Sequence, residues 1–212
     1  QIGDEEIAEK DIWKVIAVRT IKKMNEDKDG PWYDKILMPD QKKYSQSDIK
    51  ADKSKKHKRI TLATSFITSL SPIVNYLDSN RWSGDTLTID NKVSDLFDIL
   101  DAYWSALKIV MKPAFNGADN YVLQKTPGLF SLHKLLKEVI TMTSFTGQSP
   151  THISTYQTMF DKSISNHGES FVSEWWKKDK DPINNVGKPA SYGSMKGFQE
   201  LYLLIKRDLE QS

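Results

Sequence analysis

Basic side chains are the groups of this 212-residue chain best suited to chemistry with a ligand. They are densest between residues 53 and 59, where the sequence reads Lys-Ser-Lys-Lys-His-Lys-Arg. Ammonium and guanidinium groups at that density neutralise phosphates, and the resulting affinity falls steeply with salt. The sequence therefore predicts a phosphate-binding segment that consists of Lys53, Lys55, Lys56, Lys58 and Arg59. A solvated loop without a ligand is the alternative, because the net charge of the chain is only +2.

A glycine-bearing loop at residues 186–197 is a second candidate for anion binding. It carries Lys188 and Lys196 and precedes a predicted helix, whose first backbone amides favour a negatively charged group. The alternative is an ordinary helix start, in which Ser194 caps the helix and the glycines permit a tight turn.

Aromatic and acidic pairs are weaker candidates. Trp175 and Trp176 either offer a stacking surface for bases or place a ring in the core. Asp95 and Asp98, or Asp98 and Asp101, share one face of a predicted helix and have the ligand type that hard cations prefer. Exposed helix surface is the more common role of carboxylates at that spacing.

Signatures of catalysis are absent from the sequence. It contains no phosphate-binding Gly-x-x-x-x-Gly-Lys-Ser/Thr loop, no Gly-x-Gly-x-x-Gly, no His-Glu-x-x-His and no Gly-x-Ser-x-Gly. A metal site needs several converging ligands, but each of the histidines lacks a second ligand three or four residues away. These histidines are His57, His133, His152 and His167. We therefore expect no catalytic residue, no metal and no cofactor in this chain.

Apolar residues that recur at intervals of three and four predict a helical protein. The helices are expected at about residues 4–24, 65–77, 91–111, 128–139, 150–164, 171–176 and 195–209. Pro72 is expected to kink or shorten the second of them. Two β-prone runs, residues 35–38 and 58–62, are expected to pair as a small ribbon.

These patterns indicate a mainly α fold, in which residues 1–212 form a single multi-helix domain of about seven helices with at most a small β-ribbon. The core is expected to include Trp104, Leu107, Leu132, Leu136, Phe160, Leu201 and Ile205. Cysteine is absent, and no apolar run reaches the roughly 20 residues that span a bilayer. We therefore expect a cytoplasmic protein without membrane contact. The chain opens at Gln1 without Met, so we expect it to be the C-terminal part of a longer protein.

Four segments of the chain carry a family resemblance. They are Met-Asn-Glu-Asp-Lys-Asp-Gly-Pro-Trp-Tyr at 24–33 with Ile36, Leu-Asp-Ala-Tyr-Trp-Ser-Ala-Leu-Lys at 100–108, Leu-Gln-Lys-Thr-Pro-Gly-Leu-Phe-Ser-Leu at 123–132, and Gly-Ser-Met-Lys-Gly-Phe-Gln-Glu-Leu at 193–201. In order and approximate spacing they resemble the region that follows the Asp-Gly-Gln-His-Arg motif of DGQHR-domain proteins, the DndB-like regulators associated with DNA phosphorothioation. The motif itself does not occur here.

The resemblance implies the helical C-terminal portion of a prokaryotic or phage protein linked to DNA modification, defence or regulation. The first hypothesis is a DNA-associated accessory module that contacts phosphates without sequence preference. The second is a protein-interaction or structural helical domain without nucleic-acid contact, whose partner is the missing N-terminal half or another protein. A third is part of a hydrolase whose active site lies mainly in that missing half.

Overall fold

The computed structural model describes residues 11–39, 60–82, 87–181, 183–184 and 186–211. Within these ranges the chain forms seven α-helices and one two-stranded ribbon, which confirms the predicted mainly α fold. The α-helices are α1 (Ile12–Glu26), α3 (Ala63–Asn80), α4 (Ile89–Val110), α5 (Lys112–Asn116), α6 (Thr126–Thr146), α7 (Ile153–Ser165) and α8 (Met195–Glu210). The strands are β1 (Ile36–Leu37) and β2 (Thr61–Leu62), and the 3-10 turns are η3 (Ala118–Asn120), η4 (Glu169–Phe171), η5 (Ser173–Trp176) and η6 (Lys188–Ser191).

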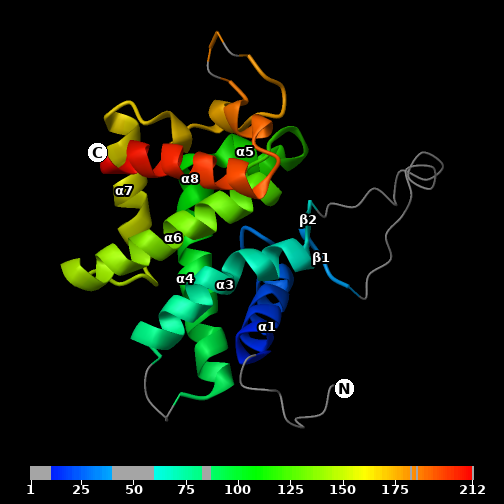
Figure 1. Ribbon diagram of the computed structural model, residues 1–212, viewed down its shortest axis with the longest axis vertical. Coiled ribbons are helices and arrows are strands. Elements are labelled where there is room, and N and C mark those ends of the chain that lie inside the picture. The colour runs from blue at the N-terminus through cyan, green and yellow to red at the C-terminus, as the bar shows by residue number, and fades with distance from the viewer. Residues whose placement is uncertain (1–10, 40–59, 83–86, 182, 185, 212) are drawn as a thin grey trace, which may run out of the picture.

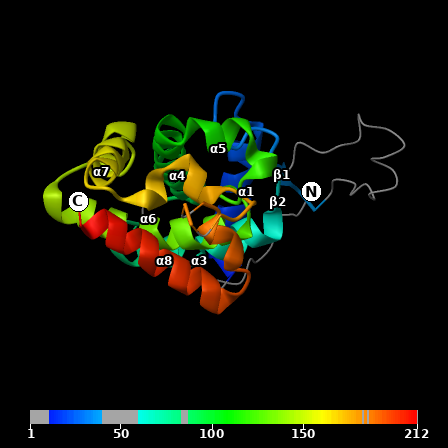
Figure 2. The same cartoon turned by 90° about the horizontal axis from the view of Figure 1, so that it is seen from above.

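The long helices pack in a closed order that differs from their order in the chain (Figure 1). Contacts run from α7 to α4, α1, α3, α6 and α8, and α8 returns to α7. Seen from above, α8 and α6 lie on one side of the molecule, and α7, α4 and α5 lie on the other (Figure 2). The ribbon of β1 and β2 lies at the end of the molecule away from α7.

Each long helix buries one apolar stripe in a shared core. In α4 the stripe includes Leu96, Leu100, Tyr103 and Leu107, which recur at intervals of three and four. All seven predicted core residues are buried. No described helix combines the length and the apolar composition that crossing a bilayer requires.

Aromatic rings form the centre of this core. The Trp32 ring meets the rings of Phe66 and Trp104 edge to face, each with centroids 4.8 Å apart. This arrangement aims ring edges at ring faces, as the quadrupoles of aromatic rings favour. Among the described residues the buried Trp32 Nε1 atom has no hydrogen-bond partner.

The ribbon is confirmed, and its two strands run parallel. Ile36 pairs with Thr61, and Leu37 pairs with Leu62. Asn25, just inside the end of α1, anchors the first strand, because its Oδ1 atom accepts a hydrogen bond of 2.8 Å from the backbone N–H of Ile36.

Several predicted helix boundaries are wrong. Thr88 caps α4 through a capping box with Asn91, so this helix begins at residue 89 rather than at the expected 91. The helix expected at 150–164 begins only at residue 153, after a turn in which the Ser149 hydroxyl bonds to that of Thr151. Helix α6 begins at residue 126, ahead of the expected start, with a proline in its first turn.

Prolines account for two further differences from the predictions. Pro72 does not shorten α3, which continues to residue 80. After the helix expected to end near residue 111, Pro113 lies in the first turn of a further short helix, α5, where its missing N–H is tolerated. The expected helix at 171–176 consists of 3-10 turns instead, so the seven α-helices are not the seven that the sequence predicted.

Candidate functional site

The predicted basic residues do not all fall within the described structure. Lys53, Lys55, Lys56, Lys58 and Arg59 lie outside the described residues. Lys188 is half-buried and begins η6. Lys196 is exposed in the first turn of α8, with its Nζ atom 4.0 Å from a carboxylate oxygen of Glu200.

The 186–197 loop has the geometry of a helix start. The Ser194 Oγ atom accepts a hydrogen bond of 3.1 Å from the backbone N–H of Gly197. Gly187 adopts a left-handed φ of 71°, where a Cβ atom would collide with the Asp179 carbonyl. The capping alternative is therefore confirmed, and one amide that a phosphate would need already has a partner.

A different set of lysines gathers around residues 116–125. Lys35 is the most enclosed, and its Nζ atom donates to Gln124 Oε1 at 2.9 Å and to the Phe115 carbonyl at 3.5 Å. Gln124 is held by its own bond to the Pro31 carbonyl, at 3.0 Å. Burial, and then repulsion from the ammonium group of Lys108, lower the pKa of Lys35 from 10.5 to about 8.

Lys125 and Lys178 form a second pair of like charges. The Lys125 Nζ atom donates to the Asp119 carbonyl at 3.0 Å, and the Lys178 N–H donates to the Asn120 carbonyl at 2.8 Å. Burial, followed by the adjacent Lys178 side chain, lowers the pKa of Lys125 to about 8. Asp119 opposes that shift without cancelling it.

Two adjoining hollows lie beside these lysines, and Lys125 and Lys178 are joined to the lining by their bonds to Asp119 and Asn120. The first, about 370 Å3, is lined by Lys35, Ile60 and residues 115–120, and the second, about 460 Å3, is lined by Asn120 and by residues of the 177–186 segment. Asn120 borders both hollows. We call this region the lysine surface, defined by Lys35, Lys125, Lys177, Lys178 and Lys180.

Carboxylates moderate the charge of the lysine surface. Asp119 lines the first hollow, and Asp179 and Asp181 line the second. Lys177 forms an ion pair with Glu174. The surface therefore combines an excess of cations with local neutralisation, which suits a weak and reversible contact with a polyanion.

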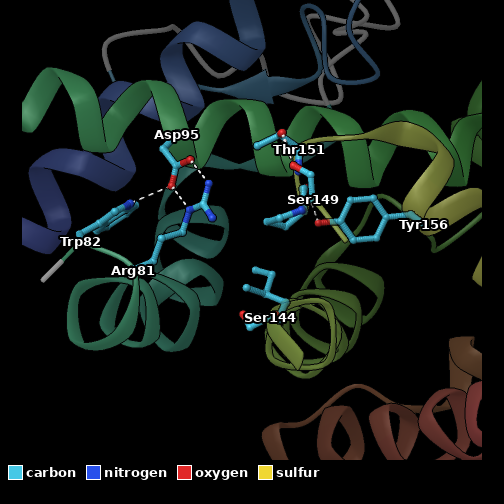
Figure 3. Close-up of polar contacts among 9 residues, drawn as sticks. Arg81, Trp82, Asp95, Ser144, Ser149, Thr151 and Tyr156 are labelled. Atoms are coloured by element: carbon cyan, nitrogen blue, oxygen red, sulfur yellow. Dashed lines mark hydrogen bonds and ion pairs between the residues drawn. The ribbon is translucent and has the colours of Figure 1, made fainter. Parts of the chain in front are cut away.

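Asp95 has a structural role (Figure 3). Its carboxylate accepts bonds of 2.7 and 2.8 Å from the Arg81 guanidinium and one of 2.8 Å from Trp82 Nε1. These three bonds hold the end of α3 against α4 and occupy the oxygens that a cation would need. The described residues contain no group of three or more acidic or histidine side chains placed to hold a metal.

A buried serine and histidine also lie within hydrogen-bond distance, 2.8 Å from Ser69 Oγ to His133 Nδ1. The Trp104 indole donates to His133 Nε2 at 3.1 Å, so Nε2 is the acceptor and Nδ1 carries the proton. His133 therefore donates to Ser69, which in turn donates to the Phe66 carbonyl at 2.7 Å. Such a histidine cannot take the serine proton, and burial lowers its pKa to about 3. Trp104, His133 and Ser69 therefore form a hydrogen-bonded chain that supports the core and has no catalytic role.

The tryptophan pair is buried as well. Trp175 is 4% exposed and Trp176 is 0% exposed, and the two rings meet edge to face. The Trp176 indole donates to the Ser170 carbonyl at 2.7 Å. Neither ring face is available for base stacking, so this alternative is wrong.

Comparison with known proteins adds no relative. The chain has no significant match among protein-family models, curated proteins or solved structures. The resemblance to DGQHR-domain proteins therefore stays a prediction that rests on the four sequence segments alone.

Proposed function

We propose that this chain is a DNA-associated accessory module of a prokaryotic or phage DNA-modification or defence protein, and that it contacts phosphates without reading bases. The observation that carries the proposal is the contact between the like-charged side chains of Lys125 and Lys178 on the lysine surface, together with the repulsion of Lys35 by Lys108, which is not one of the five lysines of that surface. Crowded ammonium groups raise the free energy of the unliganded protein. A phosphate bound beside them relieves that repulsion, which gives the surface an affinity for anions.

The order of residues along the chain also supports phosphate binding at the lysine surface. The described structure resumes at Ile60, which follows the predicted basic segment 53–59 directly in the sequence. Ile60 lines the same hollow as Lys35, and its backbone N–H donates to the Lys35 carbonyl at 2.8 Å. One peptide bond therefore separates Arg59 from this surface.

The lysine surface also explains why binding is expected to be weak and independent of sequence. Lysine ammonium groups are point charges that do not match base edges, and phosphate contacts position a protein without specifying sequence. The DNA-modification context has a separate support, the resemblance of residues 24–36, 100–108, 123–132 and 193–201 to DGQHR-domain proteins.

Anisotropy of a labelled duplex, titrated at several salt concentrations, tests the proposal. Two variants remove cations, Lys125→Ala with Lys178→Ala, and the fourfold Ala replacement of Lys55, Lys56, Lys58 and Arg59. Each is expected to weaken binding and to reduce the logarithmic salt slope by about 0.9 for every phosphate that the variant no longer neutralises. Lys162→Ala is the matched control, because this exposed lysine lies on α7 at the far end of the molecule (Figure 2).

The pH dependence of the same titration isolates the lysine surface from the 53–59 segment. Because the pKa values of Lys35 and Lys125 are about 8, both side chains lose their charge between pH 7 and 9, and DNA affinity should fall over that range. The fall should shrink in a Lys35→Met, Lys125→Met double variant. Equal affinity, salt slope and pH profile in all proteins would contradict the proposal.

The protein-interaction alternative has an observation of its own. Phe145 is 86% exposed and Met142 is 48% exposed near the end of α6. If no duplex binding is measured, these side chains become the first positions at which to look for a protein contact.

A further inference from the structure

Helices α3, α6 and α8 enclose a groove that is separate from the lysine surface. It has a volume of about 490 Å3, within the range of small-molecule sites. Ser69, Ser71 and Pro72 of α3 line one side, and Met195, Phe198 and Gln199 of α8 line another. The three helices lie next to one another in Figure 1, with α6 between α3 and α8.

Aromatic rings give the groove an apolar wall. Phe130 of α6 and Phe198 of α8 stack with centroids 5.3 Å apart and their planes 24° apart. Met195 is 66% exposed beside them, although a thioether side chain favours burial. This side of the groove therefore suits an aromatic or short aliphatic body.

Buried hydrogen bonds hold the walls at fixed separations. Ser131 of α6 donates to the Phe198 carbonyl at 3.0 Å, which ties α6 to α8 beside the stacked rings. The 2.8 Å bond between Ser69 and His133 ties α3 to α6. Because both bonds are buried, the walls of the groove are held in place without a ligand. Less binding free energy is therefore spent on ordering the walls when a ligand binds.

The charges of the groove favour an anion. The Lys137 ammonium has no ion-pair or hydrogen-bond partner within the described parts of the chain. Among the described residues, the Lys134 ammonium contacts two neutral groups, the Gln199 side-chain oxygen and the face of the Tyr202 ring, 4.8 Å from its centroid. Glu138 is the one carboxylate among the described lining residues, and it pairs at 3.5 Å with Lys206, which also lies 3.6 Å from Glu210. With Lys134 and Lys137 against Glu138, the charge balance of the lining is positive.

We propose that this groove binds a small amphipathic anion, a carboxylate or sulfonate attached to an aromatic or short aliphatic body. The apolar part packs on Phe130, Phe198 and Met195, and the anionic group lies between the ammonium groups of Lys134 and Lys137. Apolar surface supplies most of the affinity in such a site, and the two ammonium groups select a ligand that carries a negative charge.

Three probes of one shape test the class of ligand: 2-naphthoate, 2-naphthalenemethanol and 2-naphthylmethylammonium, each titrated against the full chain by ligand-observed NMR. Naphthoate should bind most tightly and the ammonium compound least. Lys137→Glu, which changes a side chain at the rim, should weaken naphthoate binding at least about fivefold. The same reversal at Lys162 of α7 is the control and should leave the affinity unchanged.

Thr68→Trp tests the location, because this exposed residue of α3 lines the groove and an indole would fill it. It should abolish naphthoate binding, whereas Thr64→Trp one turn earlier should not. Helical circular dichroism verifies that each variant folds, and Lys137→Glu decides the question if a tryptophan variant does not fold. Three results would overturn the proposal: no naphthoate binding, equal binding of the ammonium probe, or a dimer of this chain that Thr68→Trp dissociates.

Discussion

Trp104 combines an apolar and a polar role in one side chain. It is fully buried, its ring packs against Trp32 and Phe115, and its indole N–H completes the hydrogen bonding of His133. Polar groups inside a core are tolerated only when each finds a partner. His133 meets that condition with one donor and one acceptor, which fixes the register between α3, α4 and α6.

Replacement of Trp104 by Ala is expected to cost about 3–5 kcal/mol in the free energy of unfolding, because it removes a fully buried ring. The loss should fall in the upper part of that range, since His133 Nε2 is left without its donor. Urea denaturation measures it. Trp13→Ala is the control, because Trp13 is only partly buried and should cost much less. A loss below about 1 kcal/mol would show that the core does not depend on this ring.

His133 should make stability depend on pH. Its pKa is about 3 in the folded chain against 6.5 for a free imidazole, so between these values the unfolded chain binds the additional proton. Stability is therefore lost as the pH falls from about 6.5 towards 3, by at most roughly 1.4 kcal/mol per pH unit. Urea midpoints at pH 7, 6, 5 and 4 measure the slope. His133→Gln should flatten it, whereas His152→Gln, at an exposed position, should not.

For the helices, the periodicity of apolar side chains predicted where each long helix lies, whereas the local residue types did not predict where each one begins and ends. Apolar stripes located the long helices, because only burial of a continuous face stabilises them. Helix ends were less predictable, since Thr88 and Asp90 are both good capping residues and only their three-dimensional setting selects Thr88. Likewise, the prolines near 113 and 127 are compatible with both the end and the start of a helix.

The sequence shows the lysines at 177–180 as a short run, but it could not show that Lys35 and Lys125 join them. Lys35 and Lys125 are separated by 90 positions, and each is an ordinary lysine in its local segment. Their lowered pKa values come from burial and from neighbouring charges that only folding brings close. By contrast, the predicted cluster at 53–59 is visible because it is contiguous in the chain.

Gly128 tests how the start of α6 is packed. A Cβ atom there would overlap the Leu123 carbonyl, although alanine is intrinsically the better helix former. Gly128→Ala is therefore expected to destabilise the chain by about 1–3 kcal/mol. Gly193→Ala, where a Cβ atom meets nothing within 4 Å, should be close to neutral. Thermal unfolding compares the two, and equal melting temperatures would contradict the close approach.

For the whole molecule, the closed helix order separates two surfaces. The lysine surface lies on the loops beside the ribbon, and the amphipathic groove lies between α3, α6 and α8. The two surfaces share no lining residue. Variants of one should therefore leave binding at the other unchanged, since distant sites without shared partners contribute independently.

The parallel pairing of Ile36 with Thr61 has a topological consequence. The chain leaves the ribbon at one end, after Leu37, and returns at the opposite end, before Thr61, along strands that lie about 4.8 Å apart. A linker of about eight glycine and serine residues is long enough to join Pro39 to Ile60. We expect the chain with this replacement to keep its helical circular dichroism spectrum and its melting temperature within a few degrees.

Loss of the fold on that replacement would show that the segment belongs to the core. If the fold is kept, residues 40–59 can be replaced by other sequences without loss of the helical structure. Loop-closure entropy changes by only about 0.6 kcal/mol per doubling of length, so inserts of very different length can occupy the same two anchor points. The helices would then keep their fold while the sequence between Pro39 and Ile60, and with it the charge that this part of the chain presents to other molecules, is replaced.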